Sequence, residues 1–135
     1  MVWQYSQGLN TAAFASRLSD NDTLIVDSGH SRVVEVSPQG STVWQFFTNQ
    51  SLGSNPAPAP SYAVRLAGGD TLISDTLNDR VIVVDSAGRI VYQYGETNVP
   101  GNGEGELNGP YSAYVIGDYT GQTAAPGSSW SVWSG

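Results

Sequence analysis

The 135-residue chain has no cysteine and no lysine, and only one histidine and one methionine. Without cysteine it has neither a disulfide framework nor a thiolate site. Its five basic residues are single, scattered arginines and its net charge is −7, so we expect no nucleic-acid partner, which would need a basic face. The same shortage of positive charge disfavours anionic membrane surfaces. We also expect no membrane insertion, because no apolar run approaches the roughly 20 residues of a spanning helix. No secretory signal is visible at Met1.

The residues that are plentiful are small and polar, with 16 glycines and only 13% charged residues. This composition and length predict a single β-rich domain over residues 1–135 with many turns. A chain without Cys and Lys but rich in Ser, Thr, Asn and Gly is typical of exported proteins, which favours an extracellular or cell-surface location. Two sequons, at Asn21 and Asn49, are candidate glycosylation sites that also read as polar loop tripeptides.

An internal repeat is the strongest signal in the sequence. Residues 13–46 align with 61–94 at a constant shift of 48, without a gap, and fourteen of the 34 positions are identical. A period of 40–50 residues indicates a β-propeller or another stacked array. Each unit contains four short runs of strand character separated by Gly, Asn, Asp or Pro. The predicted strands are Phe14–Leu18, Thr23–Val26, Val33–Val36, Thr42–Phe46, Tyr62–Leu66, Thr71–Ser74, Val81–Val84 and Ile90–Tyr94. Four antiparallel strands per repeat make one propeller blade, so the predicted fold class is all-β with virtually no helix.

Two matched acid–base pairs flank one turn in each unit: Asp27 with Arg32, and Asp75 with Arg80. A carboxylate and a guanidinium on either side of a tight turn can bond bidentately and hold it closed. We interpret these pairs as turn clamps and not as catalytic groups.

The pattern A-x-R-L…D-T-L-I-x-D-x-x-x-x-R-V-x-x-V, closing on V-W/Y-Q-Y/F, resembles the NHL-type β-propeller repeats. It is most similar to the arylsulfotransferase-like propeller subgroup with a VWQY outer strand. The resemblance covers about residues 1–116 and implies the propeller fold. Propellers of this kind scaffold ligand binding, catalysis and surface assembly alike, so the resemblance selects no single function.

The two ends of the chain look complementary. Val2, Trp3, Gln4 and Tyr5 copy the last strand of a unit, while residues 110–135 copy the beginning of one at a shift of 50. The second segment predicts a weak strand near Gly121–Ala125 and another over Trp130–Ser134, with the fourth strand beyond the chain. The chain thus has about three blades' worth of strands, but closed propellers need at least four blades. Either the N-terminal strand completes the third blade of another copy, or the chain is a piece of a larger propeller; two copies would make six blades.

Other candidate site residues are weaker. His30, with its counterpart Asn78, and Asp79 are turn residues that form a candidate ligand rim, and a cation on Asp75, Asn78 and Asp79 would lack the six to eight oxygens of a calcium site. The Gly-rich loop 95–109 is acidic and lacks a phosphate-binding pattern. Trp130 and Trp133 are read as packing groups or as an aromatic platform for sugar.

Three functions remain open. The first is a non-enzymatic structural protein without cofactor or metal, whose copies form a homo-oligomeric ring or an extracellular filament by strand exchange; the assembly residues would be Val2, Trp3, Gln4, Tyr5, Trp130 and Trp133. The second is a carbohydrate- or small-ligand-binding module, with a glycan as a candidate partner. The third is a fragment of a propeller enzyme, which is weakened because no catalytic His constellation is present.

Overall fold

The computed structural model describes residues 4–5, 8–111, 113–115 and 132–134, and the structural statements below concern these residues. They form two four-stranded antiparallel sheets and one two-stranded sheet. Blade 1 consists of β1 (Ala12–Arg17), β2 (Thr23–Asp27), β3 (Arg32–Val36) and β4 (Thr42–Phe47); blade 2 consists of β5 (Tyr62–Arg65), β6 (Thr71–Asp75), β7 (Arg80–Val84) and β8 (Ile90–Tyr94). All eight strands predicted within the two repeats are confirmed, with ends displaced by at most two residues.

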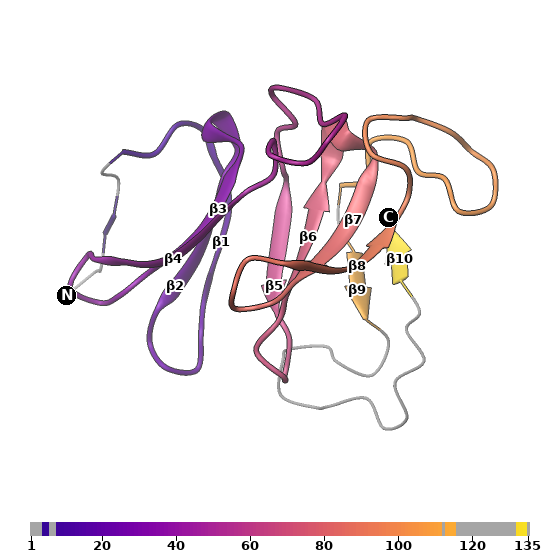
Figure 1. The fold of residues 1–135 in the computed structure, drawn as a ribbon. Coiled ribbons are helices and arrows are strands. Elements are labelled where there is room, and N and C mark those ends of the chain that lie inside the picture. Colours follow the sequence, from indigo (N-terminus) through magenta and orange to yellow (C-terminus); the bar gives the residue numbers. More distant parts are fainter. Residues whose placement is uncertain (1–3, 6–7, 112, 116–131, 135) are drawn as a thin grey trace.

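Both blades are meanders in which each strand pairs with the next along the chain, and they stand side by side in Figure 1. Equivalent hairpins carry equivalent turns. The β3–β4 and β7–β8 turns each place a glycine at positive φ, +87° at Gly40 and +83° at Gly88, a conformation that side-chain-bearing residues adopt at a cost. The register also shifts at the same place in both blades, between Glu35 and Val36 and between Val83 and Val84.

The core lies between the blades, because successive residues of a strand point to opposite faces of its sheet. Leu24, Val26 and Val33 of blade 1 are buried against Ala63, Ile73, Ile82 and Val84 of blade 2. Complete burial of one such aliphatic side chain contributes roughly 1.5–3 kcal/mol. This alternation explains why the strands read as almost continuous apolar runs: a blade between two neighbours is buried on both faces.

Helix is limited to one short 3₁₀ turn per blade, η1 (Ser28–His30) and η2 (Thr76–Asn78). Each ends on a left-handed residue, Ser31 at φ 56° and Asp79 at φ 55°. The described part of the chain contains no helix with the length and hydropathy that a membrane span requires.

The third unit differs from the sequence prediction. Its strands β9 (Ala113–Val115) and β10 (Val132–Ser134) pair directly with each other, whereas the sequence predicted a further strand near Gly121–Ala125 between them. That predicted strand lies outside the described residues.

The N-terminal strand over Val2–Tyr5 is predicted to pair with a blade of another copy, so the single chain does not test this prediction. Gln4 and Tyr5 are described but belong to no strand, while Val2 and Trp3 lie outside the described residues. An outer strand needs a sheet edge for its hydrogen-bond ladder, and the described part of this chain has no blade on that side of blade 1. Tyr5 packs instead against the flank of blade 1 opposite to blade 2.

Candidate functional site

The clamp of blade 1 is built around the buried carboxylate of Asp27. Its Oδ1 accepts a hydrogen bond from the Asn10 N–H at 2.7 Å. Its Oδ2 lies 2.7 Å from Arg32 Nε and 2.9 Å from His30 Nδ1. His30, which we predicted as a turn residue or part of a ligand rim, therefore lies at the turn with its side chain 46% exposed and bound to the clamp.

The contacts of Arg32 differ from the bidentate pair that the sequence suggested. Only Nε reaches Asp27, while Nη1 donates to Gln45 Oε1 at 3.1 Å and Nη2 to the Gly8 carbonyl at 3.1 Å. The guanidinium thus ties three segments together: the β2–β3 turn, the outer strand β4 and the approach to β1.

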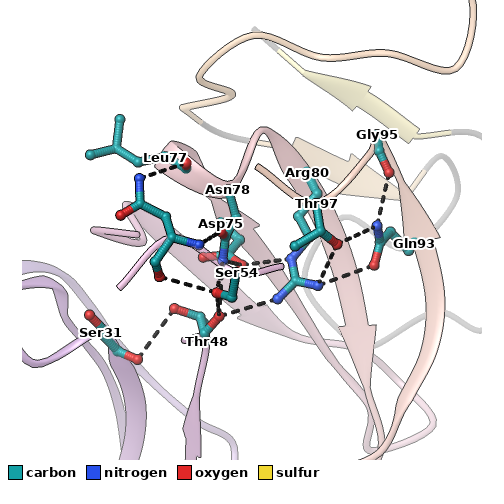
Figure 2. Close-up of polar contacts among 11 residues, drawn as sticks. Ser31, Thr48, Ser54, Asp75, Leu77, Asn78, Arg80, Gln93, Gly95 and Thr97 are labelled. Atoms are coloured by element: carbon teal, nitrogen blue, oxygen red, sulfur yellow. Dashed lines mark hydrogen bonds and ion pairs between the residues drawn. The ribbon is translucent and has the colours of Figure 1, made fainter. Parts of the chain in front are cut away.

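The clamp of blade 2 is more deeply buried, and Figure 2 shows its network. Arg80 Nε lies 2.7 Å from Asp75 Oδ2, and the exposed side-chain fractions are 1% and 0%. The other guanidinium nitrogens donate to Gln93 Oε1, Thr97 Oγ1 and the Thr48 carbonyl, each at 3.2 Å. Because Thr48 follows β4, this arginine joins blade 2 to blade 1.

Asn78 completes the same network. Its Nδ2 donates to Asp75 Oδ2 at 2.9 Å, to Ser54 Oγ at 2.8 Å and to the Thr48 carbonyl at 3.0 Å. Its Oδ1 accepts from the Asn55 N–H at 2.6 Å. Asn78 is fully buried, which does not fit a place on a surface ligand rim; it fastens the long loop between the blades.

Asp79, the last residue of the candidate rim, is also buried, and its Oδ1 accepts from the Gly109 N–H at 3.0 Å. A cation on Asp75, Asn78 and Asp79 fits poorly, because the guanidinium of Arg80 already contacts the Asp75 carboxylate.

The two clamp carboxylates have opposite electrostatics despite equal positions in the repeat. Burial alone would raise the pKa of Asp27, but hydrogen bonds from Asn10, Arg32 and His30 outweigh it and lower that pKa. Burial raises the pKa of Asp75 and prevails over Asn78 and Arg80. Asp75 Oδ1 is buried without a hydrogen-bond partner among the described residues. The reason is in the sequence: the residue 48 positions after Asn10 is Pro58, which has no N–H to donate.

Replacing Pro58 with alanine should therefore stabilise the protein at neutral pH. The new N–H can donate to Asp75 Oδ1, and a hydrogen bond to a charged group contributes about 1.5–3 kcal/mol. Loss of proline costs about 0.4–1 kcal/mol through the unfolded state, so we expect a net gain of about 1–2 kcal/mol in urea denaturation. We choose alanine and not asparagine for position 58. In blade 1 the side chain of Asn10 lies close against Gly29, whereas in blade 2 the residue that matches Gly29 is Leu77, which has a side chain.

The gain should disappear in acid. A new donor lowers the raised folded-state pKa of Asp75, so the gain over wild type is complete above the folded-state pKa of the wild type and is lost as the pH falls and Asp75 becomes protonated. Asn10→Pro is the matched variant and should destabilise blade 1. Equal stability of wild type and P58A at neutral and acid pH would contradict this assignment of the unsatisfied oxygen.

An ionic junction that the sequence analysis missed joins the blades at the opposite end of the strands. Arg65 of β5 places Nη2 2.8 Å from Glu35 Oε1 of β3 and donates from Nε to Thr71 Oγ1 at 3.0 Å. Its guanidinium carbon lies 5.4 Å from the ring centroid of Trp44 on β4, within reach of a cation–π contact. The residue that matches Glu35 in the second repeat is Val83, so comparison of the repeats did not indicate an ion pair at this position.

Carboxylates gather at this junction. Single oxygens of Asp20, Asp22 and Glu35 lie within 4.8 Å of one another. Burial and the neighbouring Asp22 raise the pKa of Glu35, and the ion pair with Arg65 offsets this only in part. Arg65 already places a positive charge 2.8 Å from Glu35, and this charge offsets the repulsion among the carboxylates without a metal ion.

Glu35→Gln should change the pH dependence of stability. Folded Glu35 keeps its proton above its ordinary pKa of 4.5, so its contribution to the unfolding free energy falls as the pH rises through that window. The stability of E35Q relative to wild type should therefore increase between mildly acidic and neutral pH, measured by urea denaturation. E104Q, on the exposed Gly-rich loop, serves as the control. A stability difference that stays constant with pH would show that Glu35 titrates normally.

An open groove of about 560 Å³ runs between the first strands of the two blades, β1 and β5. Its walls combine aromatic, charged and hydroxyl side chains, including Phe14, Arg17, Asp20, Tyr62 and Arg65. Phe14 and Tyr62 contact each other with ring centroids 4.8 Å apart. Mixed apolar and polar lining of this kind suits a small amphipathic ligand.

The remaining predicted residues are dispersed. Asn21 is exposed at φ +74°, and Asn49 donates from Nδ2 to the Pro56 carbonyl at 3.3 Å. Trp133 lies in β10 opposite Tyr114, and Trp130 lies outside the described residues. The structure thus brings together the clamp residues and Asn78, whereas Val2, Trp3 and Trp130 of the predicted assembly residues lie outside the described part of the chain.

Comparisons with known proteins support the fold. No family model and no curated protein sequence matches the chain. Solved structures of β-propeller proteins do match: a streptogramin B lyase (20% identity, TM-score 0.52), a catalytically inactive virginiamycin B lyase from Staphylococcus aureus with quinupristin (13%, 0.53), and a protein of unknown function from Bacteroides caccae (16%, 0.54). They match 68%, 71% and 79% of this chain, which spans only 28%, 31% and 38% of theirs. The chain therefore has the length of about a third of these propellers.

Proposed function

We propose that this chain is a non-enzymatic building unit of a β-propeller, and that copies of it complete one another by strand exchange into a ring or a filament. In the same proposal the assembly is extracellular or at the cell surface. The two described blades end in flanks that, in a closed propeller, would contact further blades.

The packing of Tyr5 carries this proposal. In the sequence, Tyr5 matches Phe46 of the outer strand β4. Phe46 packs onto the interface where β6 and β7 of blade 2 meet blade 1, and Tyr5 packs onto the corresponding residues of blade 1, Ile25, Val34 and Val36. Tyr5 therefore lies where a residue from the outer strand of a preceding blade would lie. The inner strands of that blade are what residues 110–135 of another copy would supply.

A buried hydroxyl on the other flank supports the same reading. Ser74 takes the place of Val26 in the repeat and so lies on the face of blade 2 turned toward the third unit. Its Oγ is buried without a partner among the described residues. Such groups are normally satisfied in finished structures, so the unpartnered hydroxyl supports the proposal that a further group packs on this flank.

A second candidate function is supported by the lengths of the matched propellers and by the groove between β1 and β5. In this alternative the chain is a section of a longer propeller, and the groove is part of a site for a glycan or another small ligand. The blades that close the ring then belong to the same protein, and no exchange between copies takes place.

Electron microscopy of the purified chain separates these alternatives. The assembly proposal predicts closed rings or filaments whose repeating mass is that of one chain, while the second candidate predicts small single particles. Single particles that gain stability on addition of an oligosaccharide would favour the ligand-binding function.

A further inference from the structure

The groove between β1 and β5 has two ends of different chemistry. At one end the rings of Phe14 and Tyr62 lie 4.8 Å apart. The other end is lined by Arg65, where β5 ends, and by Asp20 in the turn after β1. Tyr62 and Arg65 are three residues apart on one strand, which places the two ends about 10 Å from each other. The groove volume of about 560 Å³ is typical of small-molecule sites, which take roughly 300–1,000 Å³.

The aromatic end is an apolar wall that is held in place. Phe14 packs on the hydrophobic core between the blades, and its ring meets that of Tyr62 at an interplanar angle of 52°, a tilted contact of the kind that aromatic pairs favour. Both side chains are half-buried and line the groove. This end can therefore take a flat apolar group of a ligand.

The charged end has a fixed guanidinium with donors to spare. Arg65 Nη2 bonds Glu35 at 2.8 Å and Nε bonds Thr71 at 3.0 Å, but Nη1 has no hydrogen-bond partner among the described residues. In the clamp of blade 2, by contrast, all three nitrogens of Arg80 donate to neighbours. Arg65 is thus oriented by the protein and still able to donate into the groove.

An acceptor lies near this donor. An oxygen of Asp20 is within 4.8 Å of an oxygen of Glu35, and Glu35 contacts Arg65 at 2.8 Å. The charged end therefore combines a carboxylate, which only accepts hydrogen bonds, with a guanidinium, which only donates them. Between the two ends, the half-buried Ser16 lines the groove and has no hydrogen-bond partner in the described part of the chain.

This arrangement selects for a neutral ligand with adjacent hydroxyl groups. A hydroxyl can donate to a carboxylate and accept from a guanidinium, so two neighbouring hydroxyls satisfy both groups. A carboxylate on the ligand would be repelled by the three acidic side chains gathered at this end, and an ammonium group would be repelled by Arg65. A sugar has the required hydroxyls, and a glycoside also carries an apolar group one sugar ring away from them.

We propose that the groove between β1 and β5 binds a neutral glycoside, with its sugar at the charged end and its apolar aglycone on the aromatic end. Arg65 Nη1 donates to one sugar hydroxyl, and the Asp20 carboxylate accepts from the next. The Ser16 hydroxyl bonds the glycosidic oxygen between the two ends. This inference rests on the second candidate function and names the ligand class of its groove; it does not depend on assembly.

Isothermal titration calorimetry of the full chain with three related probes tests this ligand class. Phenyl β-D-glucoside should bind about tenfold more tightly than methyl β-D-glucoside, because only the phenyl group reaches the aromatic end. Phenyl β-D-glucuronide, which differs from the first probe by a carboxylate, should bind at least about tenfold more weakly than phenyl β-D-glucoside at neutral pH.

Two variants assign the ends of the groove. Asp20→Asn should weaken binding of both glucosides about fivefold, because a charge-assisted hydrogen bond becomes a neutral one, and should reduce the penalty on the glucuronide. Asp20 is exposed, so the melting temperature should not change. Tyr62→Leu should remove most of the preference for the phenyl group and leave binding of methyl β-D-glucoside nearly unchanged. Glu104→Gln is the control, since it makes the same charge change on an exposed loop.

The contradicting results differ for each part of the proposal. If the wild type binds the glucuronide as tightly as the glucoside, the assignment of Arg65 and Asp20 is wrong while the groove remains a ligand site. If E104Q weakens binding as much as D20N, the effect is one of net charge and that assignment is again wrong. If none of the three probes binds while an oligosaccharide stabilises the chain, the ligand class is wrong and the second candidate function stands. If the oligosaccharide has no effect either, both fail together.

Discussion

Replacing Arg80 with methionine should lower the free energy of unfolding by about 3–5 kcal/mol, the range for removing one partner of a buried ion pair. Arg80 and Asp75 are 1% and 0% exposed, so the variant leaves a buried carboxylate without its counter-ion. It also removes the hydrogen bonds that Arg80 donates to Gln93, Thr97 and the Thr48 carbonyl. Urea denaturation at neutral pH, followed by tryptophan fluorescence, measures the loss.

Arg32→Met is the matched variant in blade 1. Arg32 is 17% exposed, and Asp27 retains its bonds from Asn10 and His30 when Arg32 is removed. We expect a loss of about 1–2 kcal/mol, the scale of hydrogen bonds to a charged group. Equal losses in the two variants would show that burial does not determine the strength of the clamp.

Deleting residues 1–6 should strongly weaken assembly while both described blades keep their strands. The deletion removes Tyr5, whose ring packs on Ile25, Val34 and Val36, and with it the segment that we propose as the outer strand of a neighbouring copy. Loss of one buried aromatic side chain and of a strand's hydrogen bonds costs at least about 3 kcal/mol, which corresponds to a dissociation constant about 100-fold higher. Size-exclusion chromatography with light scattering measures the change.

A point variant separates the strand from the aromatic contact. Tyr5→Ser should weaken assembly in the same direction, whereas Leu52→Ser should have no effect, because Leu52 is fully exposed on the loop between the blades. Far-ultraviolet circular dichroism should show the same strand content in all variants. If the truncated chain assembles as the full chain does, strand exchange through the N-terminus is wrong.

The repeat made the blades predictable from the sequence. Matched residues such as Leu24 and Leu72, or Val33 and Val81, lie at the same place in both sheets, because the alternation of a strand fixes which face each residue occupies. The clamp pairs were also visible, since Asp and Arg recur at a fixed spacing around the turn. Their depth was not: only the structure shows that Arg80 is buried and that Arg32 is partly exposed.

The parts that differ between the repeats could not be predicted. Glu35 faces Arg65 across the blades, but its counterpart is Val83, so comparison of the repeats gave no signal. Asn78 is a candidate rim residue in the sequence because it matches His30 in the repeat, whereas in the structure the loop after β4 covers it and satisfies its amide. Pro58 shows the reverse case. The sequence alone did not indicate that Pro58 leaves Asp75 without a backbone donor, because this follows only from the hydrogen bond of the Asn10 N–H to Asp27 in the structure.

The native mass of the full chain at micromolar concentration tests the central claim most directly. One chain has a mass of 14.3 kDa. If copies complete one another's blades, native mass spectrometry should show an integral multiple of that mass, the smallest being the two-copy ring. The multiple should give way to the single chain only on dilution below the dissociation constant of the assembly. A stable monomer of 14.3 kDa across the concentration range would contradict the account and leave the chain as a section of a larger propeller.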